Sequence, residues 1–539
     1  MKRILTKIAA LCLCICLLLT GCVDLPGYWQ ELGEILGLAT TAFADMEYVR
    51  PEQGAVPESV AAVEKAISDG VGVEELMEAV YAAYGTYYDF YTNYSLANIH
   101  YYRDLTDIYW EDEYEHCLTL SAEVDAAMDN MLYCLADCPL KEELEAGDFF
   151  GEDFFDAYQG ESIWDETFTA LMEKEAKLQS RYYELSEESM AVQYGSEAFY
   201  TTYGKQMMEL YVELVQLRQE IAAYAGYTDY PSFAYEFYYA RDYSPQHAMN
   251  LMEQIATELL PVYRSLGGND VWYTGYLDST QKQTMDYVRS AATAVGGVVE
   301  EAFQVMEAAG LYDISCSENK YAASFEVYLV NYECPYVFVN PSMTVYDQLT
   351  FVHEFGHFSN DYASYGNGGG IDVKEFFSQG MEYLSLTYAD GGSTLEELKL
   401  ADSLCIYVEQ TAYAWFEQQV YGLQDDALTV EAVTALYGEA MKTYGLDMWG
   451  VDSRSYVGVH HFFDAPLYII SYVVSNDAAL QLYQLEQQTA GSGKTLYMEN
   501  LDTLEWNFLA FVESAGLESP FAPERMKAVR ATFEEVFLP

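Results

Sequence analysis

The longest regular pattern in this chain is helical, and it limits the possible folds more than any other feature. From about residue 53 to residue 265, apolar and aromatic residues recur at spacings of four and seven, as at Leu171, Leu178 and Tyr182. Helix breakers are sparse over this stretch. A helical period sustained for this long predicts a fold built mainly from α-helices.

The rest of the chain adds one small sheet to the helical pattern. A loop over about 265–280 precedes a predicted long helix that ends near Gly310. Residues 325–332 and 336–340 are rich in Val, Tyr and Phe, which makes them good strand candidates. Helical patterns return from residue 342 to the C-terminus. We therefore expect a mainly α fold with one small β-sheet.

Length and composition place the chain among large globular proteins. At 539 residues it is longer than one hydrophobic core usually supports, so we expect one multi-lobed unit or two packed subdomains. Hydrophobic residues make up 51% of the chain and aromatic residues 16%, which excludes a disordered acidic chain despite a formal net charge of −61. A negative field of this size repels phosphate backbones, so we expect no nucleic-acid partner.

The N-terminus has the pattern of a bacterial lipoprotein signal. Residues 1–22 have a basic start and an apolar run over 8–19, and the run is too short to span a membrane comfortably. The ending Leu-Thr-Gly-Cys resembles a lipobox, in which Cys22 becomes the lipidated first residue. We expect an exported chain that is anchored by this lipid to the outer face of the bacterial cell membrane, with 23–50 as a tether. An uncleaved anchor or ordinary secretion is the alternative.

The cysteines do not indicate a metal site. Six of the ten lie beyond residue 22, and none has zinc-ribbon spacing. Cys134 and Cys138 could share a helix face, and both disulfides and free buried thiols stay open for an exported chain.

The strongest motif is His353-Glu354-Phe355-Gly356-His357. On a helix, the two histidines lie one turn apart on the same face, where their imidazoles can bind one cation. Glu354 then projects toward a bound water as a general base. Zinc suits this ligand set, and we expect one zinc ion per chain. Two surface histidines without a metal, or a structural zinc, are the alternatives.

A third ligand is needed, and two glutamates downstream are candidates. Glu375 and Glu382 lie two helical turns apart on one face, so one can bind the metal while the other hydrogen-bonds a ligand imidazole. Spacing alone does not choose between them. The spacing of Asp372 and Glu375 also fits a helix capping box, and Glu382 also fits an ordinary buried ion pair.

These residues resemble the thimet oligopeptidase and oligoendopeptidase F family of zinc peptidases. The family's HEFGH or HELGH core matches 353–357. Its second motif, Glu-x-x-Ser-Gln/Thr-x-x-Glu, matches Glu375, Ser378, Gln379 and Glu382. The resemblance covers about 215–480. It implies that Glu375 is the third zinc ligand and that Glu382 lies outside the ligand set.

The resemblance also implies substrate-contacting residues on either side of the motif. Segment 334–340 looks like the family's edge strand, which receives the substrate backbone, so Tyr336 and Phe338 are predicted to bind substrate. Downstream, 461–472 resembles the segment that faces the metal. There His461, Tyr468 and Tyr472 are predicted to stabilise the oxyanion, with Tyr468 slightly preferred to Tyr472.

The sequence departs from the family in two places. The family usually has His three residues after the second ligand His, where this chain has Asn360. The segment between His357 and Glu375 is also short and carries a glycine-rich stretch at 366–370. The short segment keeps the choice between Glu375 and Glu382 open.

The sequence as a whole predicts a lipid-anchored zinc oligoendopeptidase. The resemblance implies a deep channel between two helical lobes, which we place at 51–230 and 231–539, the second carrying the catalytic residues. Short unfolded peptides are the expected substrates, and we expect a monomer. The alternatives are a surface peptide-binding lipoprotein that has lost turnover and a thermolysin-like protease that digests larger proteins.

Overall fold

The computed structural model describes residues 40–147, 149–160, 162–267 and 271–538. The predicted signal peptide, Cys22 and most of the predicted tether lie outside these residues. Among the described residues the fold is mainly α with one small sheet, which confirms the prediction. No described helix is long and apolar enough to cross a membrane.

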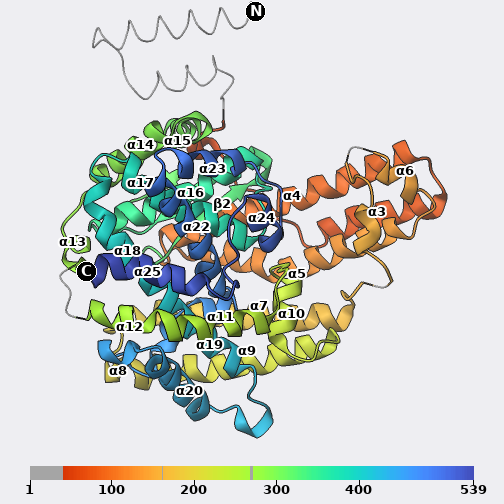
Figure 1. Ribbon diagram of the computed structural model, residues 1–539. Helices are drawn as coiled ribbons and strands as arrows, with labels where there is room; N and C mark the ends of the chain where they lie inside the picture. Colours follow the sequence, from red (N-terminus) through yellow and green to blue (C-terminus); the bar gives the residue numbers. More distant parts are fainter. Residues whose placement is uncertain (1–39, 148, 161, 268–270, 539) are drawn as a thin grey trace, which may run out of the picture.

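The first half of the chain consists of helices. In chain order they are α3 (Ala55–Asp69), α4 (Val73–Arg103), α5 (Ile108–Ala136), α6 (Lys141–Glu145), α7 (Glu166–Ser189), α8 (Glu197–Phe199), α9 (Lys205–Tyr224), α10 (Tyr230–Phe237), α11 (Pro245–Glu258) and α12 (Leu260–Tyr263). Figure 1 shows α3–α6 extending together from one side of the molecule.

The second half holds the sheet and the remaining helices. Its strands are β1 (Tyr312–Asp313), β2 (Ser324–Leu329) and β3 (Cys334–Val339). Its helices are α13 (Val271–Gly275), α14 (Gln281–Val295), α15 (Gly297–Ala309), α16 (Tyr346–Ser364), α17 (Ile371–Tyr388), α18 (Glu396–Cys405), α19 (Thr411–Val420), α20 (Val430–Thr443), α21 (His461–Asp464), α22 (Ile470–Gln488), α23 (Ser492–Asn500), α24 (Phe508–Ser514) and α25 (Arg525–Phe537).

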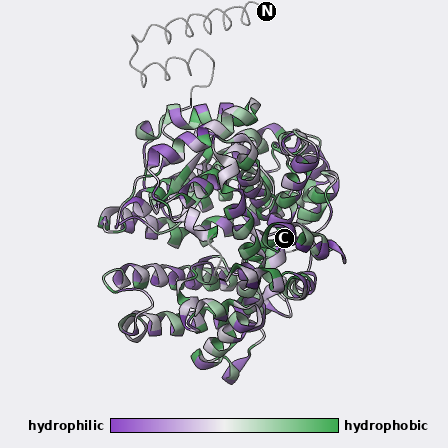
Figure 2. Cartoon of the chain, turned by 60° about the vertical axis from the view of Figure 1, so that its left-hand side comes forward, coloured by the Kyte–Doolittle hydropathy of each residue, from purple (hydrophilic) through white to green (hydrophobic). Residues whose placement is uncertain are grey.

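The buried residues form two clusters. A small core joins α3, α4 and α5, where apolar residues recur every three or four positions, as at Val56, Val60 and Val63. A large core runs from α4 to α25 and contains the sheet. Figure 2 shows helices that carry both hydrophobic and hydrophilic residues, as expected of helices packed around a core. The predicted domain limits at 51–230 and 231–539 stay a prediction.

The sheet has the order β1-β3-β2, so β3 is its central strand. β3 pairs parallel with β1 and antiparallel with β2, where Ser324 lies opposite Val339. Both predicted strands are confirmed. β1 was not predicted, because two residues are too few to show an alternating pattern. The outer edge of β2 has no strand partner among the described residues.

Glycines determine the course of the helices around the sheet at two places. α16 contacts α17 so closely that a Cβ on Gly356 would lie 2.5 Å from Ser378 Cα, so only glycine fits there. The predicted long helix before Gly310 is wrong, because the backbone breaks between α14 and α15 at Gly296 and Gly297, with φ of +76° and +60°. Glycine adopts this left-handed region without strain.

Candidate metal centre

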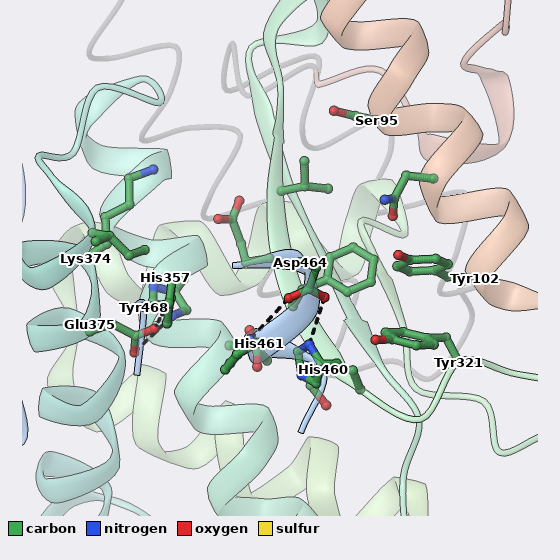
Figure 3. A pocket seen from close by; sticks show the side chains of 18 of the residues that line it. Ser95, Tyr102, Tyr321, His357, Lys374, Glu375, His460, His461, Asp464 and Tyr468 are labelled. Carbon is green, nitrogen blue, oxygen red and sulfur yellow. Dashed lines mark hydrogen bonds and ion pairs between the residues drawn. The ribbon is translucent and has the colours of Figure 1, made fainter. Parts of the chain in front are cut away.

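The two histidines of the motif and Glu375 converge on one point. α16 carries His353 and His357 one turn apart, and α17 brings the buried Glu375 against them. Glu375 Oε2 lies 3.4 Å from His353 Nε2 and 3.6 Å from His357 Nε2. Figure 3 shows Glu375 beside His357 at the cavity wall.

This arrangement fits a zinc ion. Zinc bonds of about 2.0–2.2 Å in a tetrahedral site separate the ligand atoms by roughly 3.3 Å, close to the observed spacings. Burial acts to raise the pKa of Glu375, but His357, His353 and a hydrogen bond from Tyr468 outweigh it and hold this pKa at about 2. Burial lowers the pKa of His357 to about 4. A carboxylate and a neutral imidazole are the forms that bind metal.

Glu382, the second candidate glutamate, contacts His353 on Nδ1, the ring nitrogen that does not face Glu375. His353 Nδ1 donates to Glu382 Oε1 at 2.8 Å, and the other carboxylate oxygen of Glu382 lies 2.7 Å from Lys399 Nζ. The Lys399 side chain is buried. A carboxylate on Nδ1 fixes the ring orientation and leaves Nε2 free for a metal.

Asp372 and Glu375 do not form the capping box that was the alternative explanation of their spacing. α17 begins at Ile371 with Gly370 as its N-cap, and no side chain caps this end. The carboxylate of Asp372 instead accepts a hydrogen bond from Tyr243 at 2.8 Å and pairs with Arg241 at 3.4 Å. Asp372 therefore ties α17 to the segment before α11.

Glu354 lines the same cavity as the three candidate ligands. Burial raises the pKa of its carboxyl to about 8, and the neighbouring Glu375 and Glu382 add to the rise. Such a group holds a proton more tightly than an exposed glutamate.

The structure brings the predicted oxyanion residues to the candidate ligands. Tyr468 donates a hydrogen bond to Glu375 Oε1 at 2.5 Å. His461 Nε2 lies 3.1 Å from the hydroxyl of Tyr472, and the His461 and Tyr468 ring centroids are 5.0 Å apart. All three residues line the cavity.

Buried charged residues that the sequence did not identify as functional hold this segment in place. Arg218 donates to the carbonyls of Phe462, at 2.7 Å, and Phe463. Arg241 donates to the carbonyl of Leu467 at 3.0 Å and to Ser471 Oγ at 2.8 Å. Both arginines lie within the 215–480 range that the family resemblance covers, but no role was predicted for them. A single buried cation leaves no periodic pattern in the sequence.

Leu467, between the predicted oxyanion residues, has a strained backbone. Its φ is +64°, a conformation that costs a branched side chain energy, and Glu417 accepts its N–H at 2.7 Å. This bond helps to hold the turn that aims Tyr468 at Glu375.

The cavity has a volume of about 600 Å³. One wall comes from α4, and the facing wall comes from β2, α16, α17 and the segment after residue 459. The α4 residues at this wall are Tyr91, Tyr94, Ser95, Asn98 and Tyr102.

The structure does not place Tyr336 and Phe338, the predicted substrate-binding residues, at the cavity. These side chains are 1% and 0% exposed and do not line the cavity. Segment 334–340 is not an edge strand, because β1 covers the side of β3 that would otherwise be free. Instead, Ser324, Phe325, Glu326 and Val327 of β2 line the cavity.

The two departures from the family pattern pack against each other. The Asn360 side chain donates to the carbonyl of Leu501 at 2.8 Å, away from the candidate ligands. A Cβ on Gly368 would lie 2.4 Å from Asn360 Oδ1, and one on Gly370 would lie 2.4 Å from the carbonyl of Trp506. The short glycine stretch therefore fits between α16 and the chain after residue 500.

Comparisons with known proteins agree with this fold. Residues 43–162 match a family model described as the peptidase M3 N-terminal domain. No curated protein matches the chain. A putative oligoendopeptidase F matches with 19% identity and a TM-score of 0.79 over 92% of this chain and 98% of its own. PZ peptidase A in complex with an inhibitor matches with 17% identity and a TM-score of 0.80, over 92% and 99%.

A putative oligoendopeptidase F from Bacillus anthracis str. Ames also matches, with 19% identity and a TM-score of 0.77 over 92% of this chain and 98% of that one. At this identity the likeness establishes the two-lobed helical fold. The fold and the matched N-terminal domain together support a metallopeptidase hydrolase, a class of enzyme that carries a metal ion.

Proposed function

We propose that this protein is a zinc-dependent oligoendopeptidase that hydrolyses short unfolded peptides. The observation that carries the proposal is the convergence of His353, His357 and Glu375 beside Glu354 in one cavity. Zinc bound by these three residues would supply Lewis acidity and would lower the pKa of a water molecule.

Glu354 moves the proton in the proposed reaction. Its carboxylate takes the proton of the attacking water and delivers it to the leaving amine, so one residue acts first as base and then as acid. The buried position raises its pKa, which makes it a stronger base than an exposed glutamate.

Tyr472 is the best-placed donor for the oxyanion. The hydroxyl proton of Tyr468 is already donated to Glu375 Oε1. The Tyr472 hydroxyl can accept from His461 Nε2 and turn its own proton into the cavity. On this ground we propose Tyr472 as the main donor, although the sequence slightly favoured Tyr468. Donors fixed before the reaction stabilise charge without reorganisation.

The cavity walls favour extended peptides. The outer edge of β2 is free of strand partners among the described residues and can pair with a peptide backbone, and the tyrosines of α4 face it across the cavity. The strongly negative chain favours cationic or neutral peptides. Export, lipidation at Cys22 and a monomeric state belong to the proposal on sequence grounds.

Metal analysis combined with peptide cleavage tests this function. Wild type should bind zinc and cleave quenched-fluorescent peptides, Glu375→Ala should lose both properties, and Glu354→Gln should keep zinc but lose turnover. Glu382→Ala should weaken zinc binding less than Glu375→Ala does. If Glu382→Ala strips the metal and Glu375→Ala does not, the ligand assignment is wrong. Zinc-loaded wild type that cleaves no peptide would indicate a binding protein instead.

A further inference from the structure

We infer that His460, His461 and Asp464 form a second binding site for a divalent transition metal. The three residues lie at and just before α21, and they line the same cavity as the first cluster. Figure 3 shows both histidines close to Asp464, to one side of His357 and Glu375. The inference goes beyond the proposed peptidase function and does not depend on it.

The spacing of the second cluster resembles that of the first. His460 Nδ1 and Asp464 Oδ2 are hydrogen-bonded at 3.0 Å, and Asp464 Oδ1 lies 3.8 Å from His461 Nδ1. These values bracket the 3.4 Å and 3.6 Å found around Glu375. In each cluster, one ligand atom from every residue lies within 4.8 Å of the others. A single ion can therefore contact all three residues in either cluster.

Two buried polar atoms point at the gap in this cluster. His461 Nδ1 and Asp464 Oδ1 have no hydrogen-bond partner among the residues that the structure describes, and at 3.8 Å they are too far apart to bond to each other. Leaving such atoms unpaired costs free energy. A cation between them would satisfy both atoms.

The carboxylate is already held in position. The hydroxyl of Tyr183 donates to Asp464 Oδ2 at 2.5 Å, and the side chain of Gln179 donates to the Asp464 carbonyl at 3.3 Å. Arg218 holds the carbonyls of the two residues between His461 and Asp464. Little ordering is needed on binding, which favours affinity.

Two imidazoles and one carboxylate select the kind of ion. This ligand set suits Zn²⁺, Co²⁺, Ni²⁺ or Cu²⁺ better than Mg²⁺ or Ca²⁺, which prefer oxygen ligands. The side chains of His460, His461 and Asp464 are 37%, 20% and 20% exposed, so the remaining coordination positions open into the cavity. Because these side chains are more exposed than Glu375, we expect the second site to bind a metal ion more weakly than the first.

Occupation of this site would act on Tyr472 through His461. A metal on Nδ1 places the ring proton on Nε2, which then donates to the Tyr472 hydroxyl 3.1 Å away. That hydroxyl must then direct its own proton elsewhere, and the cavity is the open direction. The second site would therefore favour the donor orientation proposed for Tyr472.

Cobalt titration of the metal-free full chain tests the inference. Equilibrium dialysis with elemental analysis should give two equivalents of Co²⁺ in wild type and one in His460→Gln, and the visible absorption of the weaker equivalent should disappear in the variant. His247 lies more than 200 residues before the cluster, in the exposed N-terminal turn of α11. His247→Gln is therefore the matched control and should keep two equivalents of Co²⁺. Asp464→Asn is a second variant and should also keep one.

The outcomes separate this inference from the peptidase proposal. One equivalent in saturated wild type that Glu375→Ala abolishes would overturn the second site. The second site would also be overturned if folded His460→Gln and Asp464→Asn both bound two equivalents of Co²⁺, or if the control His247→Gln lost one. One equivalent that His460→Gln abolishes and Glu375→Ala does not would support the second site and contradict the first. Circular dichroism verifies that each variant is folded.

Discussion

Glu375 and Glu382 show what a single residue's position does to its chemistry. They share one face of α17, yet Glu375 faces the Nε2 atoms and Glu382 faces the Nδ1 atom of His353. Sequence spacing placed both near the motif and could not rank them, because either nitrogen of an imidazole can receive a carboxylate. In the structure the two carboxylates contact different nitrogens of His353, and the spacing of residues along the sequence does not predict which nitrogen each one contacts.

Lys399 should affect metal affinity although it touches no candidate ligand. Changing Lys399 to Met leaves the buried Glu382 carboxylate without its cation, so His353 loses its fixed orientation. We expect zinc affinity, measured by chelator competition, to fall roughly 10- to 100-fold. Lys282→Met, which removes an exposed pair with Asp286, is the control. Equal affinities in the two variants would refute the role of Lys399.

His100 should make the stability of the protein sensitive to acid. Its ring stacks on Trp110 at 4.2 Å, and burial, aided by Arg103, lowers its pKa from 6.5 to about 4. The folded state therefore prefers the neutral ring. Its contribution to stability is complete above pH 6.5 and is lost as the pH falls toward 4. The urea midpoint of His100→Phe should drop less than that of wild type between pH 7 and 4.5. Parallel curves would contradict this assignment.

The segment from His461 to Tyr472 depends on a distant part of the chain for its shape. Arg218, Arg241 and Glu417 hold its backbone, and all three are buried. The sequence predicted the segment but not its supports, since contacts between residues 50 to 244 positions apart leave no local pattern. The sheet shows the same limit: β2 and β3 were predicted, but pairing with β1 decides which of them is the edge strand.

Removing Arg241 should weaken both stability and turnover. Arg241→Met leaves the buried Asp372 carboxylate without its cation, with only the hydrogen bond from Tyr243, and frees the carbonyl of Leu467. We expect a loss of about 3–5 kcal/mol in the free energy of unfolding. Because Tyr468 and Tyr472 shift, kcat should fall while zinc content stays at one equivalent or more. Arg530→Met removes a half-exposed pair with Glu258 and should cost below about 1 kcal/mol. Similar losses in both variants would argue against the special position of Arg241.

Gly356 should be intolerant of a single methyl group. In Gly356→Ala the added Cβ would lie 2.6 Å from the carbonyl of Phe377, so α16 and α17 must separate. We expect destabilisation of about 1–3 kcal/mol and weaker zinc binding, because His357 moves away from Glu375. Gly85→Ala in α4 meets nothing within 4 Å and should stabilise by about 0.5–1 kcal/mol. A neutral Gly356→Ala would show that the helices have room to adjust.

The whole molecule builds its cavity from segments that are far apart in the chain. The tyrosines of α4 face a motif some 250 residues later. The sequence predicted the mainly α class and the two candidate histidine ligands, since both rest on local spacing, and the family resemblance added Glu375. The resemblance implied a channel between two lobes but not which helix of the first lobe forms the wall opposite the motif, because the packing of two amphipathic surfaces does not depend on their order in the chain.

Substrate size should be limited by this enclosure. We expect efficient cleavage of quenched-fluorescent peptides of about ten residues, and little or none of folded proteins, because the candidate metal ligands line a cavity between α4 and β2 that suits an extended chain. A length series that extends to casein, analysed by mass spectrometry, measures the limit. Digestion of casein at the rate of short peptides would instead support a thermolysin-like protease.

The free edge of β2 has a second consequence. An exposed strand edge is a common starting point for aggregation, since it can pair with the edge of any neighbouring molecule. Here the edge lies along a cavity lined by tyrosines rather than on an open surface. We expect this position to leave less room for the sheet of another folded copy than for a single extended strand. The same cavity that would select substrates would then also limit self-association through this edge.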